Sequence, residues 1–497
     1  MIGKNRIRVG SNTALSRGKL VLEAQKPVTS ISPALFGEGI LRVLMGLRSV
    51  SASYSQTDGT FVPGYLPGTT LFGFEGVHAG AAPGWPFVLG WQDPDFARRA
   101  ASNGWLTLDT AQVDAYKLTR NTNFTYRINI EPFPFFRVDI TGSRQFSRNR
   151  SEFYRPSSTG GFEVLNPVES GNFSISCLFI RTAFESSGRN GDKYASPAFD
   201  KFRESRLEIA RRVAANRSSS TATGPDGVFP DGFSGVSQDV LIPAFLAAYM
   251  GSSPNDVSLA TFPTIPLPNW QITYDGLSRM TFFKELFRQV SLRHGYRANY
   301  IIGNYQTNEA YREGADGLSY VRNVQDDYIS RYQVTNVSIS EQFSPLIGLD
   351  LGFANSLTTK AEVRKNRSLA MSFANNQLTD MDSWEYVLGA GYRFENLPIV
   401  LKNQLGGKKV VKSELRVQGD FSVRNTQTIL RKLVENTNTP TAGQWSYALK
   451  LSADYMITEQ INIRFFLDRT VNTPLVSLSF PTSTTSFGFS VRFILEQ

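Results

Sequence analysis

Apolar and polar residues alternate along most of the chain from about residue 120 to its end. In residues 445–455, the aromatic and aliphatic side chains share one parity, whereas Lys450 and Asp454 share the other. Successive side chains of a β-strand point to opposite faces of the sheet. The segment is therefore predicted to be a strand with one apolar surface and one polar surface.

The same alternation recurs in seven further segments, several of which are about ten residues long: 124–130, 136–140, 290–300, 357–363, 384–394, 413–424 and 461–468. A tilted strand of about ten residues crosses a bilayer, whereas strands of soluble sandwiches usually have about five or six residues. The pattern therefore predicts an all-β fold, a transmembrane antiparallel β-barrel. Segment 485–493 is aromatic on one parity and resembles the C-terminal signature by which outer-membrane barrels are recognised for assembly.

The polar parity carries full charges of both signs in the middle of the strands, such as Lys450 with Asp454. Unpaired charges in a dry core would each cost several kcal/mol, so this parity must face water. So large an exposed apolar surface on the other parity would cause aggregation of a soluble protein, so lipid is its expected solvent. We predict a pore-lining set of Arg293, Arg297, Lys360, Glu362, Arg364, Glu385, Arg393, Glu414, Arg416, Asp420, Lys450, Asp454, Arg464, Asp468 and Arg492. The predicted lipid-facing set is Trp384, Tyr386, Trp445, Tyr447, Leu449, Leu451, Phe487 and Phe489.

Segments without alternation predict long loops and short helical inserts within one unit, 1–497. Residues 60–110 are rich in proline and glycine and are expected to form a structured insert. A second insert is expected over 185–285, because 195–216 has helical spacing and the following tract is irregular. Residues 286–497 are then expected to form a regular strand meander.

Composition agrees with a barrel but does not establish one. The 497 residues include 36 Phe, 19 Tyr and 40 Gly, and the mean hydropathy of -0.22 is unremarkable because alternating strands average out. The longest apolar run, 240–250, is too short for a transmembrane helix. The net charge of +9 is scattered, which is weak evidence for nucleic acid, and no nucleic-acid partner is expected. The first ten residues lack an apolar signal segment, so for an exported protein we expect the beginning to be missing.

Several segments, mostly in the predicted loops, resemble the C-terminal part of the SprA/Sov family, the outer-membrane translocon of the type 9 secretion system. They are 82–96, 103–107, 152–154, 237–249, 265–277, 293–300, 343–350 and 356–365, in order along the chain. The likeness extends from about residue 30 onward. Full members of the family are several times longer, so the resemblance implies the C-terminal section of a very large barrel.

The resemblance also implies a function. Folded cargo proteins with C-terminal signals would pass through the lumen, a shuttle barrel would collect them at a side opening, and a plug protein would close the empty pore. It further implies an outer-membrane location in a Gram-negative bacterium of the Bacteroidota, and a role in motility in gliding species.

Catalytic and metal chemistry find little support in the sequence. With one cysteine and two histidines, a Cys/His zinc site is nearly excluded, and no nucleotide-binding or hydrolase motif occurs in the required context. His294 is expected to be a packed aromatic on the apolar parity, and Cys177 a buried strand residue. We therefore expect no enzyme activity and no cofactor. An independent porin of about a dozen to fourteen strands and a surface-interaction barrel remain as alternatives.

Overall fold

The structure, a computed structural model, describes residues 45–70, 73, 82–157, 161–188, 191, 193–217, 222–402, 408–458, 460–476 and 479–494. Its strands are β1 (Leu47–Phe61), β2 (Tyr116–Phe133), β3 (Phe136–Pro156), β4 (Phe162–Ser176), β5 (Asn269–Tyr274), β6 (Phe287–Thr307), β7 (Tyr332–Val334), β8 (Asn336–Phe353), β9 (Leu357–Ser372), β10 (Gln377–Lys402), β11 (Lys408–Lys432), β12 (Thr437–Thr458), β13 (Ile461–Pro474) and β14 (Thr482–Phe493). The helices are α2 (Trp85–Val88), α3 (Phe96–Ser102), α4 (Pro197–Arg217), α5 (Gln238–Met250), the 3-10 turn η3 (Gly276–Arg279) and α6 (Thr281–Lys284).

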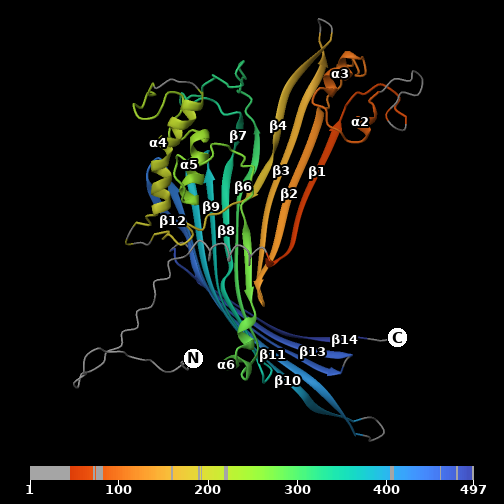
Figure 1. The fold of residues 1–497 in the computed structure, drawn as a ribbon, viewed down its shortest axis with the longest axis vertical. Coiled ribbons are helices and arrows are strands. Elements are labelled where there is room, and N and C mark those ends of the chain that lie inside the picture. The colour runs from red at the N-terminus through yellow and green to blue at the C-terminus, as the bar shows by residue number, and fades with distance from the viewer. Residues whose placement is uncertain are drawn as a thin grey trace, which may run out of the picture.

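The strands form one antiparallel sheet of fourteen, in the order β1-β2-β3-β4-β6-β8-β9-β10-β11-β12-β13-β14 (Figure 1). Two short strands lie off this path, since β5 pairs with β3 and β6, and β7 pairs with β6. Long strands thus lie beside their neighbours in sequence, as in the wall of a barrel. The predicted fold class is confirmed: the chain is all-β and antiparallel, with long loops and short helical inserts.

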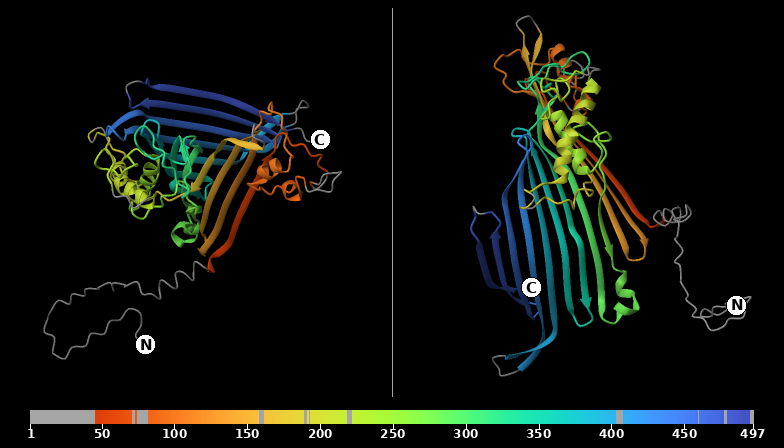
Figure 2. Two further views of the ribbon diagram at one scale, coloured as in Figure 1. Left: turned by 90° about the horizontal axis from the view of Figure 1, so that it is seen from above. Right: turned by 90° about the vertical axis from the view of Figure 1, so that its left-hand side faces the viewer.

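Both edges of this sheet are open. Within the described residues, β1 has only β2 as a neighbour and β14 has only β13. Seen from above, the N-terminal and C-terminal strands lie at opposite ends of a bent sheet (Figure 2). The described chain is therefore a section of wall rather than a closed barrel.

Most strands are much longer than the ten-residue runs of alternation. The β10–β11 hairpin keeps its register from the pair Gln377 and Lys432 to the pair Lys402 and Lys408, with one irregularity. Strands of 26 and 25 residues are more than twice as long as the roughly ten residues with which a strand crosses a bilayer. The alternation marks only their central part.

The helical insert, residues 177–268, connects β4 to β5. These two strands lie end to end between β3 and β6, and each pairs with both of them. The insert therefore leaves the sheet where β4 ends and returns where β5 begins. The insert begins and ends at the same point, because Leu267 N donates to Ser176 O at 2.9 Å. Its two long helices therefore fold as a unit against the sheet (Figures 1 and 2).

Helices α4 and α5 form the core of the helical insert. Phe199 and Phe202 of α4 and Phe245 of α5 are buried, and the rings of Phe202 and Phe245 lie 5.8 Å apart. Helix α5 ends at Gly251, which has a φ of 65° and is suited to the left-handed cap position. The helix predicted over 195–216 matches α4.

The structure changes two of the predicted boundaries. Strand β5 lies inside the predicted 185–285 insert yet belongs to the sheet, and the insert already begins at Cys177. The expected meander over 286–497 is interrupted by the loop 308–331. The sequence signal of β5 is weak because its six residues follow a proline-rich stretch. The N-terminal insert, 62–115, contains the predicted 60–110 region for the most part and packs Phe96 and Leu106 on Tyr116.

Candidate functional site

The strand register defines two faces of the sheet. Seven side chains form one cross-strand row from β5 to β12: Trp270, Tyr296, Phe343, Lys365, Trp384, Asn425 and Trp445. We call the surface that carries this row the apolar face and the opposite surface the polar face. Residues of one parity on each strand belong to one face, apart from shifts at β-bulges.

All fifteen residues of the predicted pore-lining set lie on the polar face. Their registers connect β6 to β14 without a change of face. The set has nine basic and six acidic side chains. Asp420, Lys450 and Asp468 alternate in sign across three neighbouring strands, whereas Arg393 lies directly opposite Arg416. The structure thus brings residues as distant in sequence as Arg293 and Arg492 into one charged surface.

Glu362 is the centre of an ion-pair network on the polar face. Its carboxylate oxygens contact Arg293 at 2.7 Å and Lys360 at 3.1 Å, and they also pair with Arg364. Arg364 in turn reaches Glu385, which accepts a bond of 2.8 Å from Arg424. The network is continuous over strands β6, β9, β10 and β11.

A second group of pairs lies nearer the other end of the strands. Glu414 pairs with Arg393 and Arg416, and Arg464 lies 3.7 Å from Asp454. The remaining members of the predicted set have no ion pair within 4 Å in the described part of the chain: Arg297, Asp420, Lys450, Asp468 and Arg492. Asp420 accepts a hydrogen bond of 3.0 Å from Gln418 Nε2. Water or a ligand must solvate the other four charges.

The predicted lipid-facing residues all lie on the apolar face. Tyr386, Tyr447, Leu451, Phe487 and Phe489 are exposed, the last two at 81% and 69%. Trp445 and Leu449 are half-buried. Trp384 is also half-buried, because the ring of Phe184 lies 6.3 Å from it and Lys365 lies over its face at 4.6 Å.

Exposed apolar side chains form a continuous band on the apolar face. The band lies between the cross-strand row that contains Trp384 and the strand ends farther from the helical insert. This apolar band is aromatic at both ends on β10, with Trp384 and Tyr386 at one end and Tyr392 and Phe394 at the other. The ten residue steps from Trp384 to Phe394 span about 34 Å along the strand. At a tilt of about 40° this corresponds to about 26 Å, close to the apolar belt of outer-membrane barrels.

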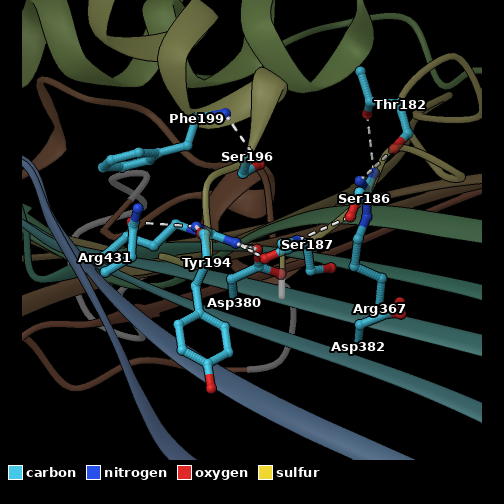
Figure 3. A network of polar contacts seen from close by, with 12 residues as sticks. Thr182, Ser186, Ser187, Tyr194, Ser196, Phe199, Arg367, Asp380, Asp382 and Arg431 are labelled. Atoms are coloured by element: carbon cyan, nitrogen blue, oxygen red, sulfur yellow. Dashed lines mark hydrogen bonds and ion pairs between the residues drawn. The ribbon is translucent and has the colours of Figure 1, made fainter. Parts of the chain in front are cut away.

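The other part of the apolar face is covered by the helical insert. There the same parity carries buried charges, of which Arg431 is fully buried and Asp380 nearly so. Arg431 forms two hydrogen bonds to Asp380, at 2.8 and 3.0 Å, and donates to the carbonyls of Tyr194 and Ser187 at 2.6 and 2.8 Å (Figure 3). The sequence analysis did not predict that part of the apolar face is covered by protein rather than lipid.

A second buried arginine repeats the arrangement. Arg367 pairs with Glu341 at 2.9 Å and donates to the carbonyl and hydroxyl oxygens of Thr182 in the insert (Figure 3). Next to it, Lys365 pairs with Asp382. The charges on β10 and β11 within a run of apolar residues are the sequence signal that could have revealed a covering element.

Loop 308–331 fixes the outer end of the insert through charged contacts. Arg322 binds Asp231 at 2.6 Å, and this bond lowers the pKa of the Asp231 carboxyl and raises that of the guanidinium. Asp327 accepts a bond of 2.7 Å from the hydroxyl of Ser234, while burial raises its pKa. Ion pairing and burial act in opposite directions on these two carboxylates.

Side chains that could bind a metal ion do not cluster in the part of the chain that the structure describes. The described residues contain no group of three His, Cys, Asp or Glu side chains that could hold a metal ion. His294 Nδ1 donates a hydrogen bond of 2.6 Å to Leu346 O and lies beside Trp270 and Phe343, as expected for a packed aromatic.

Cys177 is buried just beyond the end of β4, whereas His78 lies outside the described residues. None of the helices in the described ranges is long and apolar enough to cross a membrane.

Comparison with known proteins gives no family. No family model and no curated protein matches the chain. Among solved structures, OmpT, an outer membrane protein of Vibrio cholerae, is 7% identical over 90% of this chain and 99% of its own, with a TM-score of 0.19. The RagAB peptide transporter is 7% identical over 75% and 40%, with a TM-score of 0.24. An anion-selective porin from Comamonas acidovorans is 9% identical over 74% and 84%, with a TM-score of 0.11. Overlaps this poor carry no information about the activity of this chain.

Proposed function

We propose that this chain is the C-terminal section of the outer-membrane translocon of a type 9 secretion system. The observation that carries the proposal is a two-faced open sheet, charged on one face and apolar over a membrane-thick band on the other. In this arrangement the polar face lines an aqueous conduit and the apolar band contacts lipid. The resemblance of the loop segments to the SprA/Sov family supports the specific assignment.

The open edges favour a wall with more strands than the fourteen that the structure describes. In hydrocarbon no water is present to bind free N–H and C=O groups, so open sheet edges do not occur there. Strands β1 and β14 of 15 and 12 residues therefore need further strands beside them. A barrel completed in this way has a wider lumen than twelve strand positions could enclose, as folded cargo requires.

The charges of the polar face fit a conduit for varied proteins. Because acidic and basic side chains neutralise each other in networks such as that of Glu362, the surface selects against neither charge class. Cargo proteins with C-terminal signals, a shuttle barrel and a plug protein are the partners of this function. The chain performs no covalent chemistry in it.

Deletion of the reading frame is the direct test. We expect cargo proteins with C-terminal signals to remain in the periplasm, measured by immunoblotting of culture supernatant and periplasm. Complementation with the intact gene is the control. Normal secretion by the deletion strain would overturn the proposal and leave a porin or a surface-interaction barrel.

An independent porin is the second candidate, because the twelve strands along the main path of the sheet fall within the range of barrels that close alone. Cysteine pairs across the two edges distinguish the candidates. With Ser49 or Ser53 of β1 and Ser486 or Ser490 of β14 replaced by cysteine, we expect no disulfide within one chain, because the edges do not meet. Shifted mobility of an oxidised monomer on a denaturing gel would show closure and support the porin.

Glu362→Gln tests whether the polar face lines the conduit. The variant removes one negative charge and releases Arg293, Lys360 and Arg364 from their shared partner. We expect the chloride-to-potassium permeability ratio to rise roughly two-fold. Reversal potentials of the purified native complex in planar bilayers measure it. Glu435→Gln, in an exposed turn at the strand ends, is the matched control and should leave the ratio unchanged.

A further inference from the structure

The exchange from β4 to β5 leaves a break in the backbone ladder of the sheet. Two side chains bridge it, since Ser143 N donates to the Ser176 hydroxyl at 3.1 Å and Ala298 N donates to Asn269 Oδ1 at 2.8 Å. Cys177 N completes the junction with a bond of 3.1 Å to Ala298 O. Side-chain groups thus take the place of strand partners at one point in the wall.

One bulge of β8 lies beside this break. It shifts the register with β6 between Arg293 and Tyr296, and the register with β9 between Phe343 and Ile347. Gly295, within the first shift, has no side chain, and a Cβ there would lie 3.0 Å from Ser344 O. The combination leaves a cavity of about 360 Å³ in the polar face, within the size range of small-molecule sites.

Polar side chains from five strands line this cavity in register. Arg127, Thr141, Asn269, Arg297 and Gln342 form one row across β2, β3, β5, β6 and β8, with Asp139 and Gln271 beside it. Asp139 is the only carboxylate among the lining residues and pairs with Arg127 at 3.2 Å. The position is therefore fixed by the sheet itself and not by a loop.

Arg297 is the uncompensated charge of the cavity. Its guanidinium has no ion pair and no hydrogen bond among the described residues, and neither do the side-chain amides of Gln271 and Gln342. A guanidinium presents a planar set of N–H donors that matches a carboxylate or phosphate bidentately. The neighbouring amides add donors around the same point.

We propose that this cavity binds the oxyanion group of a small organic solute, a carboxylate or a phosphate, through Arg297. The amides of Gln271 and Gln342 hold the remaining polar atoms of the solute, and Gly295 provides the space. The proposal requires only that water reaches the polar face, so it stands independently of the secretion function.

Binding of succinate and of inorganic phosphate to the purified full-length chain in detergent tests the proposal, with calorimetry as the measurement. We expect saturable binding of at least one, weakened at least ten-fold by Arg297→Gln. Binding of succinate alone identifies a carboxylate site, and binding of phosphate alone identifies a phosphate site.

Arg416→Gln is the matched control, because it removes the same charge from the same face at a residue paired with Glu414. It should leave the affinity unchanged, and heat-modifiable migration of both variants verifies folding. No binding of either anion, equal loss in the two variants, or full affinity of Arg297→Gln would each overturn the proposal.

Discussion

Replacing Arg431 with methionine is expected to release the helical insert from the sheet. The substitution leaves Asp380 buried without its partner and removes the donors to the carbonyls of Ser187 and Tyr194. Breaking a buried ion pair from one side costs about 3–5 kcal/mol, which corresponds to at least about a hundred-fold larger released population. Limited proteolysis of the insert in the folded protein measures the released population. Urea titration measures the loss in the free energy of unfolding.

Two comparisons make this result specific. Arg424→Met removes the partner of Glu385 on the polar face, where the arginine is half-exposed and Glu385 keeps Arg364. Its expected cost is at most about 1 kcal/mol. The double variant Asp380→Leu/Arg431→Met should recover part of the loss because no charge stays buried. Wild-type protease resistance of Arg431→Met would show that the insert is held by its apolar contacts alone.

The two faces of the sheet followed from the sequence because a strand has a period of two. Leu451 and Lys450 lie on opposite faces whatever the neighbouring strands do, so parity alone assigned each predicted residue to one of the two faces. Strand length did not follow, because alternation marks only the central part of β10 and β11, and the helical insert covers the apolar face near Asp380 and Arg431. Alternation along a strand therefore predicts which face a side chain belongs to but not where the strand ends.

The insert could not be located from the sequence because its position depends on contacts between distant residues. Arg367 and Thr182 are 185 positions apart, and Arg431 and Ser187 are 244 apart. On their own strands Asp380 and Arg431 interrupt an apolar parity, yet the sequence does not say whether water, lipid or protein compensates them. The cavity beside Arg297 could not be predicted for the same reason, because its lining residues come from five strands.

Arginine at the centre of the apolar band is expected to impair membrane folding, and this effect decides whether the band contacts lipid. Leu388 lies between Trp384 and Phe394 on β10 and is 60% exposed. An arginine on the lipid face near the bilayer midplane costs about 2–4 kcal/mol. We therefore expect Leu388→Arg to destabilise the protein by this amount in its native membrane complex, measured by urea titration of the protease resistance of the chain.

The neighbouring residue gives the matched control at the same depth. Val387 lies on the polar face directly across from Glu362, so Val387→Arg places the same charge in water beside a carboxylate. Its expected effect is below about 1 kcal/mol. Equal destabilisation by the two variants would show that both faces have the same solvent, and the conduit would then have no lipid side. A large effect of Leu388→Arg alone would show that the two faces contact different solvents.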